Sequence, residues 1–344
     1  LWPLQTSYLP GATLLVYGQT KWQKRGPKTM KIIRTLAGDL PAEQFGIIDY
    51  HEHVIARPPV EKPNDIDLSL SDVDTMAKEL ENFARAGGSL LVDASTADFG
   101  DNAHLRLEIS QKAGVPVVGT VGFGQKEHHT EAVKNSSVEE LYARVTQAVR
   151  EGYGSQNLRP GQLKFGTSYQ FISPSEEKCA RAVARAQRDT GLPLFTHTGV
   201  GTMALEQLDL LREEGADLGR VCIGHMDRNP DLWLYKEILS YGVFLGLDQV
   251  SKVKYCTEQV RISLIMELVR AGYGKRILIG GDLARRSYLT AFGGGPGFAY
   301  IPSKFIPRLK RQMLEDGFTH REVENVVQDL LVNNPRSFLA LEQN

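Results

Sequence analysis

The stretch FGIIDYHEHV (residues 45–54) joins a run of apolar residues to two histidines, His51 and His53. The apolar run is typical of a buried strand. Side chains at positions i and i+2 of an extended chain point to the same face, about 6–7 Å apart. Both imidazoles can therefore reach one cation, although a His-x-His pair is weak evidence when it stands alone.

Four more side chains of metal-binding type follow strand-like runs further along the chain. They are Lys164 in GQLKFGTS, His197 in LPLFTHTG, His225 in RVCIGHMD and Asp282 in RILIGGDL. A single histidine at the end of a strand is usually an ordinary core or rim residue. Four of the eight histidines occupy such ends, however, and this repetition favours one shared metal site.

Short apolar or β-branched runs alternate with segments of helical periodicity, which is the pattern of βαβ units and a parallel sheet. The predicted strands are 45–50, 89–95, 115–121, 161–167, 193–198, 220–225, 242–247 and 276–281. The predicted helices are 71–86, 101–113, 138–151, 174–190, 202–214, 231–240 and 257–272, followed by helical segments at 302–316, 319–332 and 335–342. Eight units predict the α/β class and a single (β/α)8 barrel (TIM barrel), in which the strand ends gather around one mouth.

The domain organisation follows from the same pattern. Residues 30–344 form one predicted domain, because no linker, repeat or low-complexity segment interrupts them. Residues 1–29 are a predicted extension, with Met30 as the natural start, since the patch ATLLVY is too short for a secretory signal and precedes its basic residues.

An open doubly wound sheet is the alternative architecture. It usually carries a glycine-rich phosphate loop, but neither G-x-G-x-x-G nor G-x-x-x-x-G-K-[ST] occurs in this sequence. G-x-S-x-G and H-E-x-x-H are also missing, which argues against a serine hydrolase and a helical zinc protease. The barrel remains the favoured fold.

Composition narrows the partners of the protein. With 344 residues, 42% of them hydrophobic and 24% charged, the chain is typical of a soluble globular protein. A net charge of −1 gives no argument for binding to nucleic acid or to an anionic membrane. No run of the sequence approaches the roughly 20 apolar residues of a membrane span.

The small number of cysteines, three, suits a reducing cytoplasm. We expect a cytoplasmic protein with a small-molecule substrate, and a homodimer is one oligomeric state to test.

At this point the motifs resemble those of the phosphotriesterase family within the amidohydrolase superfamily. The resemblance covers about residues 31–342 and implies a metal-dependent hydrolase with a (β/α)8 barrel. It also implies two divalent cations, usually Zn²⁺, with Mn²⁺ and Co²⁺ as alternatives. The motifs are His51-Glu52-His53, Lys164, THTG (196–199), GHMDRN (224–229) and GGD (280–282).

The resemblance implies a role for each ligand. His51, His53 and Asp282 would hold the more buried cation, and His197 and His225 would hold the more exposed one. Two cations lower the pKa of a bridging water, and one of them polarises the carbonyl or phosphoryl oxygen of the substrate. Asp282 would also shuttle the proton, which makes it a predicted catalytic residue.

Lys164 is the other predicted catalytic residue. A protonated lysine cannot bind a metal, and a buried one is expected to lose its charge or to find a partner. An ion pair at the barrel mouth is the ordinary explanation. The resemblance implies instead that the amine of Lys164 is carboxylated by CO₂ and that the resulting carbamate bridges both cations.

Three loop segments narrow the range of expected substrates. They resemble the corresponding segments of the subgroup that hydrolyses phosphorylated sugar lactones. The segments are GTMALEQLDLL (201–211), DQVSKVKYCTEQVR (248–261) and GDLARRSYLTAFGGGPGF (281–298). The resemblance implies that Lys254, Arg285 and Tyr288 bind the phosphate, and Arg228 is a further candidate for substrate binding. Alternatively, Lys254 is a solvated loop lysine and Arg285 pairs with a nearby acid.

The predicted function is therefore a lactonase that opens a phosphorylated sugar lactone. One alternative keeps the metal centre but changes the substrate to a phosphotriester or an acyl-homoserine lactone. Another is a barrel without catalytic activity that binds a ligand, although six intact ligand positions argue against it.

Overall fold

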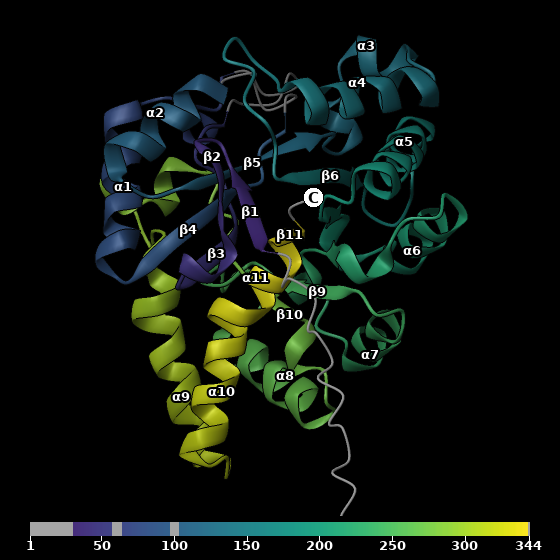
Figure 1. Cartoon of the computed structure of the whole chain (residues 1–344). Coiled ribbons are helices and arrows are strands. Elements are labelled where there is room, and N and C mark those ends of the chain that lie inside the picture. Colours follow the sequence, from purple (N-terminus) through teal and green to yellow (C-terminus); the bar gives the residue numbers. More distant parts are fainter. Residues whose placement is uncertain (1–29, 57–63, 97–102, 343–344) are drawn as a thin grey trace, which may run out of the picture.

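A barrel of eight parallel strands forms the centre of the protein, and helices surround it (Figure 1). This computed structural model describes residues 30–56, 64–96 and 103–342. The barrel strands are β3 (Ile47–Glu52), β4 (Gly88–Asp93), β5 (Val117–Gly122), β6 (Gln162–Thr167), β7 (Leu194–Thr198), β8 (Val221–Ile223), β9 (Phe244–Leu247) and β10 (Ile277–Ile279). Each strand pairs with the next one along the chain, so the predicted (β/α)8 architecture is confirmed.

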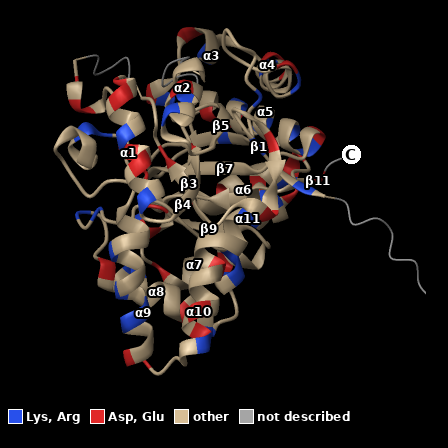
Figure 2. Cartoon of the chain, turned by 60° about the vertical axis from the view of Figure 1, so that its left-hand side comes forward, with Lys and Arg blue, Asp and Glu red and all other residues tan. Residues whose placement is uncertain are grey.

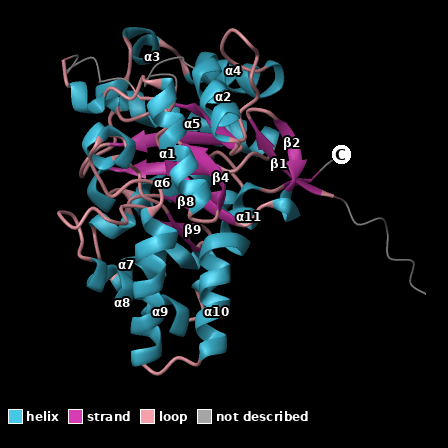
Figure 3. Cartoon of the chain, turned by 90° about the vertical axis from the view of Figure 1, so that its left-hand side faces the viewer, coloured by secondary structure: helices cyan, strands magenta, loops and turns pink. Residues whose placement is uncertain are grey.

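Helices alternate with these strands along the chain and cover the outside of the barrel. Figure 3 shows the helices in cyan around the strands in magenta. These helices are α1 (Val73–Arg85), α2 (Ala103–Ala113), α3 (Glu131–Asn135), α4 (Val138–Glu151), α5 (Pro174–Thr190), α6 (Ala204–Glu213), α7 (Leu232–Ser240) and α8 (Glu258–Arg270). All but the short α3 were predicted. The first residues of the predicted helix 101–113 lie outside the described residues.

The first and last barrel strands meet at the mouth. The backbone N–H of Asp282 donates to the carbonyl oxygen of His51 at 3.0 Å. Nearby, the N–H of Leu283 donates to Oε2 of Glu52 at 2.6 Å, across 231 residues of sequence. These contacts bring the ends of β3 and β10 together, so ligands from the two ends of the barrel domain can share one site.

Side chains, not solvent, fill the barrel. The buried residues of the interior include Ile48 on β3, Val118 on β5, Phe195 on β7 and Phe244 on β9. The larger core lies between the strands and the surrounding helices, where apolar faces of both are buried. The packed interior leaves the polar strand ends at the mouth as the place for chemistry.

Two of the predicted helices are capped at their N-termini in the structure. Asp72 caps α1 by accepting from the N–H of Thr75 at 2.8 Å. Ser173 and Glu176 form a reciprocal capping box at the start of α5, with Pro174 in its first turn. Such caps satisfy N–H groups that have no partner within the helix.

A small antiparallel sheet at the opposite end of the barrel was not predicted. It joins β1 (Lys31–Thr35) to β2 (Gly38–Pro41) and to β11 (Leu341–Glu342). The predicted helix 335–342 is wrong at its end, because α11 (Asn334–Leu339) ends before Leu341, which pairs with Ile32. This pairing joins residues more than 300 positions apart, which a local pattern does not reveal. The predicted extension, residues 1–29, lies outside the described residues.

Two further helices, α9 (Ile306–Glu315) and α10 (His320–Gln328), extend from the barrel as an antiparallel pair (Figures 1 and 3). Figure 2 shows acidic and basic residues interspersed over the helices, in keeping with the small net charge. No helix within the described part of the chain is long and apolar enough to cross a membrane.

Gly122, at the end of β5, provides a test of the packing near the mouth. A Cβ at this position would lie 1.9 Å from the carbonyl oxygen of Lys164, and φ is +140°. Gly122→Ala is expected to lower the free energy of unfolding by about 3 kcal/mol or more. Gly114→Ala is the control, because Gly114 has φ +67° and open space around it, and its cost should be about 1–2 kcal/mol. Equal losses in urea denaturation of the two variants would contradict the predicted crowding.

Candidate metal centre

The barrel brings all six predicted ligands to its mouth. His51 lies on β3, Lys164 on β6 and His197 on β7, whereas the remaining three lie one to three residues after the ends of their strands. The ring centroids of His51 and His53 are 5.7 Å apart, and those of His51 and His225 are 5.2 Å apart. The structure therefore supports a shared site, and metal binding by these residues is the proposal that follows from it.

Strand β3 reaches this arrangement through an irregularity. Its pairing with β4 shifts register between Asp49 and Glu52. Tyr50 and His51 consequently both face the interior, where Tyr50 donates to Asp248 and the His51 ring packs on Phe195 at 4.3 Å. The simple alternation expected from the sequence fails at this step, because an extra residue in a strand re-aims the side chains that follow.

The first group of ligands consists of His51, His53 and Asp282. Nε2 of His53 lies 3.1 Å from Oδ1 of Asp282, and Nε2 of His51 lies 3.4 Å from the same oxygen. Ser95 Oγ donates to the carbonyl oxygen of Ile55 at 2.8 Å, so it accepts the Nδ1 hydrogen of His53 at 2.7 Å. The lone pair of His53 Nε2 then faces a carboxylate oxygen, and a cation between them would make this contact favourable.

Asp248 orients one histidine from each half of the site. Its carboxylate accepts from Nδ1 of His51 at 2.9 Å and from Nδ1 of His225 at 2.7 Å. Tyr50 and the backbone N–H of His225 donate to the same carboxylate. Asp248 also lies close enough to both rings to be a ligand itself. Because it holds their Nδ1 atoms, we interpret it as the residue that turns each Nε2 toward the cations.

The second group consists of His197 and His225. Nδ1 of His197 lies 2.8 Å from Nε2 of His225. Since Asp248 accepts the Nδ1 hydrogen of His225, its Nε2 carries a lone pair. Gln125, from the loop after β5, contacts the other nitrogen of His197. The two facing nitrogens come from neighbouring strands and are thus a second place where imidazole lone pairs could bind a cation.

The electrostatics of the site favour metal binding. Burial lowers the pKa of His51 from 6.5 to about 4, and it also lowers the pKa of His53 and His197. Burial alone would raise the pKa of Asp282, but Lys252 and the neighbouring histidines hold it well below its ordinary value. Neutral imidazoles and an ionised carboxylate are suitable ligands for Zn²⁺, and Mn²⁺ also binds carboxylates.

Lys164 is close to residues of both groups. Its side chain is almost completely buried, and Nζ donates to the carbonyl oxygen of Ala94 at 2.8 Å. Nζ lies 5.2 Å from the ring centroid of Phe195, on which the His51 ring also packs, and its charge contributes to the lowered pKa values of His51, His53 and His197. This position is compatible with the predicted bridging ligand.

One unsatisfied atom is a direct sign that the residues fit a cation. Nε2 of His51 is buried and has no hydrogen-bond partner among the described residues. Buried polar atoms are normally satisfied, so an exception in a cluster of ligands indicates a missing partner. The first group of ligands therefore fits a cation.

Of the residues predicted to bind the phosphate, two contact each other and the third pairs with acidic residues. Nζ of Lys254 donates to Oη of Tyr288 at 2.6 Å, which joins the loops after β9 and β10. Arg285 instead uses Nη1 to pair with Asp65 at 3.3 Å and with Asp67 at 3.4 Å. The acid pairing considered from the sequence is thus present.

Arg228 lies on the side of the mouth that carries the second group. Its guanidinium is 4.3 Å from the ring centroid of Tyr255, and its charge contributes to the lowered pKa of His197. Its Nε is buried and has no hydrogen-bond partner in the part of the chain that the structure describes. Arg228 is therefore available to an acceptor on a bound molecule.

The sequence interpretation missed several residues that contact the ligands. Among them are Ser95, Gln125, Asp248, Gln249 and Lys252. Asp248 and Gln249 directly follow the end of β9, so applying the strand-end argument to every polar residue would have found them. Ser95 follows β4 in the same way.

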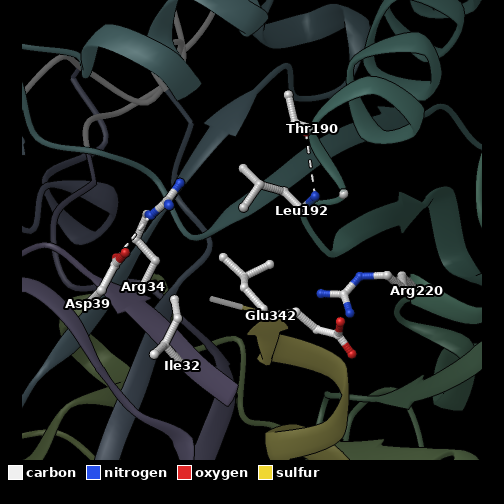
Figure 4. Close-up of a pocket in the computed structure, with 9 residues that line it drawn as sticks. Ile32, Arg34, Asp39, Thr190, Leu192, Arg220 and Glu342 are labelled. Atoms are coloured by element: carbon white, nitrogen blue, oxygen red, sulfur yellow. Dashed lines mark hydrogen bonds and ion pairs between the residues drawn. The ribbon is translucent and has the colours of Figure 1, made fainter. Parts of the chain in front are cut away.

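A cavity at the other end of the barrel has a different character (Figure 4). Its volume is about 500 Å³, and its lining includes residues that precede β7 and β8. Arg34 pairs with Asp39 at 3.0 Å, and Arg220 donates to the carbonyl oxygen of Ala340 at 2.7 Å. None of the six proposed ligands lines this cavity, so the mouth remains the candidate functional site.

Asp248→Asn tests the orientation of the histidines. An amide cannot accept from two imidazole Nδ1 atoms as a carboxylate does, so metal affinity should fall about 10- to 100-fold. Asp209→Asn, a change at an exposed residue of α6, is the control. Chelator competition measures both affinities, and an unchanged affinity of Asp248→Asn would contradict the assigned role.

Comparison with known proteins agrees with this architecture. The family model of the phosphotriesterase family matches residues 31–339. A phosphotriesterase homology protein of Escherichia coli is 31% identical over 80% of this chain and 91% of its own length. A phospho-furanose lactonase of Mycoplasmopsis synoviae is 30% identical over 91% of this chain and 93% of its own length.

A solved structure shows the same likeness. The lactonase from Listeria monocytogenes superposes with a TM-score of 0.86 at 35% identity, over 91% of this chain and 100% of that chain. The family match spans nearly all of the described barrel and includes every proposed ligand. This chain belongs to the phosphotriesterase family and is a hydrolase of that family.

Proposed function

We propose that the protein is a lactonase with two divalent cations, most simply Zn²⁺, and that it opens a phosphorylated sugar lactone. The observation that carries this substrate is the contact between Lys254 and Tyr288 at the mouth. No acid pairs with Lys254 among the described residues. A cation without a counter-ion beside a hydrolytic site is suited to an anionic group on the substrate.

The cations, when bound, supply acidity to water and polarise the carbonyl group of the lactone. The chain provides the proton acceptor. Oδ1 of Asp282 faces His51 and His53, and Oδ2 is occupied by hydrogen bonds from Gln249 and Lys252. In this proposal Asp282 takes a proton from the attacking water and delivers it to the ring oxygen that leaves.

The phosphate would bind where the loops after β9 and β10 meet. Lys254 and Tyr288 provide an ammonium and a phenolic hydroxyl. Although Nη1 of Arg285 serves Asp65 and Asp67, Nε and Nη2 have no acceptor in the described part of the chain. That edge of a guanidinium can donate two parallel hydrogen bonds to a phosphate. Arg228 and Lys254 both pack on the ring of Tyr255, so Arg228 would contact the substrate close to Lys254.

The names of relatives support the same substrate class, because the Mycoplasmopsis synoviae protein is a phospho-furanose lactonase and the Listeria monocytogenes protein is a lactonase. Phosphotriesters and acyl-homoserine lactones remain the alternative substrates. Both lack the phosphate monoester that the cationic groups would bind.

Lys164→Ala tests the proposed carbamate bridge. Without the amine no carbamate can form, so the variant should retain fewer than two metal ions per chain and lose nearly all activity. Elemental analysis after dialysis measures the metal content. Reconstituting the wild-type apoprotein in buffer depleted of CO₂ should also lower the metal content, and two ions with full activity in Lys164→Ala would disprove the bridge.

The substrate class is tested with a pentonolactone phosphate and the same lactone without phosphate. The wild-type protein should have a kcat/KM about 10- to 100-fold higher for the phosphorylated compound, because charge-assisted hydrogen bonds contribute about 1.5–3 kcal/mol. Lys254→Met should remove most of this preference, mainly through KM. Lys236→Met, at an exposed position of α7, is the control.

Two outcomes would contradict the proposal. Equal kcat/KM values for the two lactones in the wild-type protein would exclude the phosphate anchor. Rapid hydrolysis of a neutral phosphotriester that Arg285→Ala leaves unchanged would favour the alternative substrate.

A further inference from the structure

Lys252, two positions before Lys254, makes contacts that no sequence pattern indicated. Only 7% of its side chain is exposed. Nζ donates to Oδ2 of Asp282 at 2.8 Å and also contacts the backbone carbonyl oxygen of Asp282. The side chain of Lys252 therefore points into the mouth and reaches one of the proposed metal ligands.

A second donor reaches the same carboxylate oxygen. Nε2 of Gln249 lies 2.7 Å from Oδ2 of Asp282. Two hydrogen bonds thus hold Oδ2, and Oδ1 is left facing Nε2 of His51 and His53. The last torsion of an aspartate is soft, so without fixed donors either oxygen could turn toward the histidines.

A buried network fixes the chain segment from which both donors come. Nη2 of Arg261 donates to the carbonyl oxygen of Gln249 at 2.8 Å, and its Nε pairs with Asp227 at 2.7 Å. The N–H of Gln249 donates to Asp227, and the N–H of Ser251 donates to Glu258 at 2.7 Å. The position of the segment is therefore set by contacts that are independent of Asp282.

The two lysines of this loop have different partners. Both ammonium groups lie near the ring of Tyr288, at 5.3 Å for Lys254 and 5.5 Å for Lys252. Lys254 donates to the Tyr288 hydroxyl, toward the proposed phosphate, whereas Lys252 donates to Asp282. The contrast separates a residue that binds substrate from one that acts on the ligands. Neighbouring positions of one loop thus serve two purposes.

We propose that Lys252 is a positioning residue of the metal centre. Together with Gln249 it holds Oδ2 of Asp282, which fixes the rotation of the carboxylate and directs Oδ1 to the cation shared with His51 and His53. This inference rests on the proposed function, because it assumes that the cations bind where these ligands meet. Residues that orient a ligand typically change metal affinity 10- to 100-fold when they are replaced.

Lys252→Met is the decisive variant, because it keeps the length of the side chain and removes the donor. We expect its metal affinity, measured by chelator competition with Zn²⁺, to fall about 10- to 100-fold. The visible absorption spectrum of the Co²⁺-loaded protein should also change. Lys252→Arg keeps a cationic donor and should recover part of the affinity, and Lys254→Met, the matched control, should bind metal as the wild type does.

Steady-state kinetics distinguish the two lysines further. Lys252→Met should lower kcat by the same factor for the phosphorylated and the unphosphorylated lactone, because the rotation of Asp282 does not depend on the phosphate. A loss confined to the phosphorylated lactone would make Lys252 a second phosphate contact and would overturn the proposal. Wild-type metal affinity with an unchanged Co²⁺ spectrum in Lys252→Met would also overturn it.

A folding control completes the experiment. Urea denaturation of the metal-free variants shows whether Lys252→Met is folded, and Gln249→Met provides a second test by removing the other donor to Oδ2. If Lys252→Met does not fold, wild-type metal affinity in Gln249→Met overturns the proposal. If the wild-type protein binds two cations but opens no lactone, the proposed substrate is wrong, and the chelator competition still decides the role of Lys252.

Discussion

The proposed metal centre depends on the hydrogen bonds that the carboxylate of Asp248 accepts from two histidines. It accepts from Nδ1 of His51 on one side and from Nδ1 of His225 on the other, and both hydrogen bonds are buried. Burial opposes its charge, but the two histidines hold its pKa below the ordinary value. Because one anion orients a histidine in each group, the two halves of the site are coupled before any cation binds.

The charges around the mouth are arranged in two layers. The deeper layer is satisfied within the protein, since Asp282 accepts from Lys252 and Gln249. In the outer layer Lys254 and Arg228 form no ion pair among the described residues. Buried charges need partners in order to be stable, whereas cations near solvent can remain available to a ligand. This difference separates the ligands from the groups that we assign to the substrate.

Much of the fold could be predicted from the sequence, because a parallel strand buried on both faces is a local apolar run. The eight barrel strands follow this rule, and the capping residues of α5 are equally local. The pairing of β1 with β11 was missed because it joins the two ends of the domain. The irregularity in β3 was also missed, since an extra residue in a strand has no clear signature in one sequence.

The sequence by itself determined which side chains stand at the strand ends, and the resemblance of its motifs determined the family. Only the tertiary structure decided how those side chains meet: which nitrogen of each histidine and which oxygen of Asp282 face the proposed metal site, and that Lys252 turns to Asp282. Those choices depend on hydrogen bonds that Asp248 accepts and that Gln249 and Lys252 donate, and all three residues follow β9. The orientation of a ring or a carboxylate is set by its neighbours in space, and these lie as many as 197 residues away in the chain.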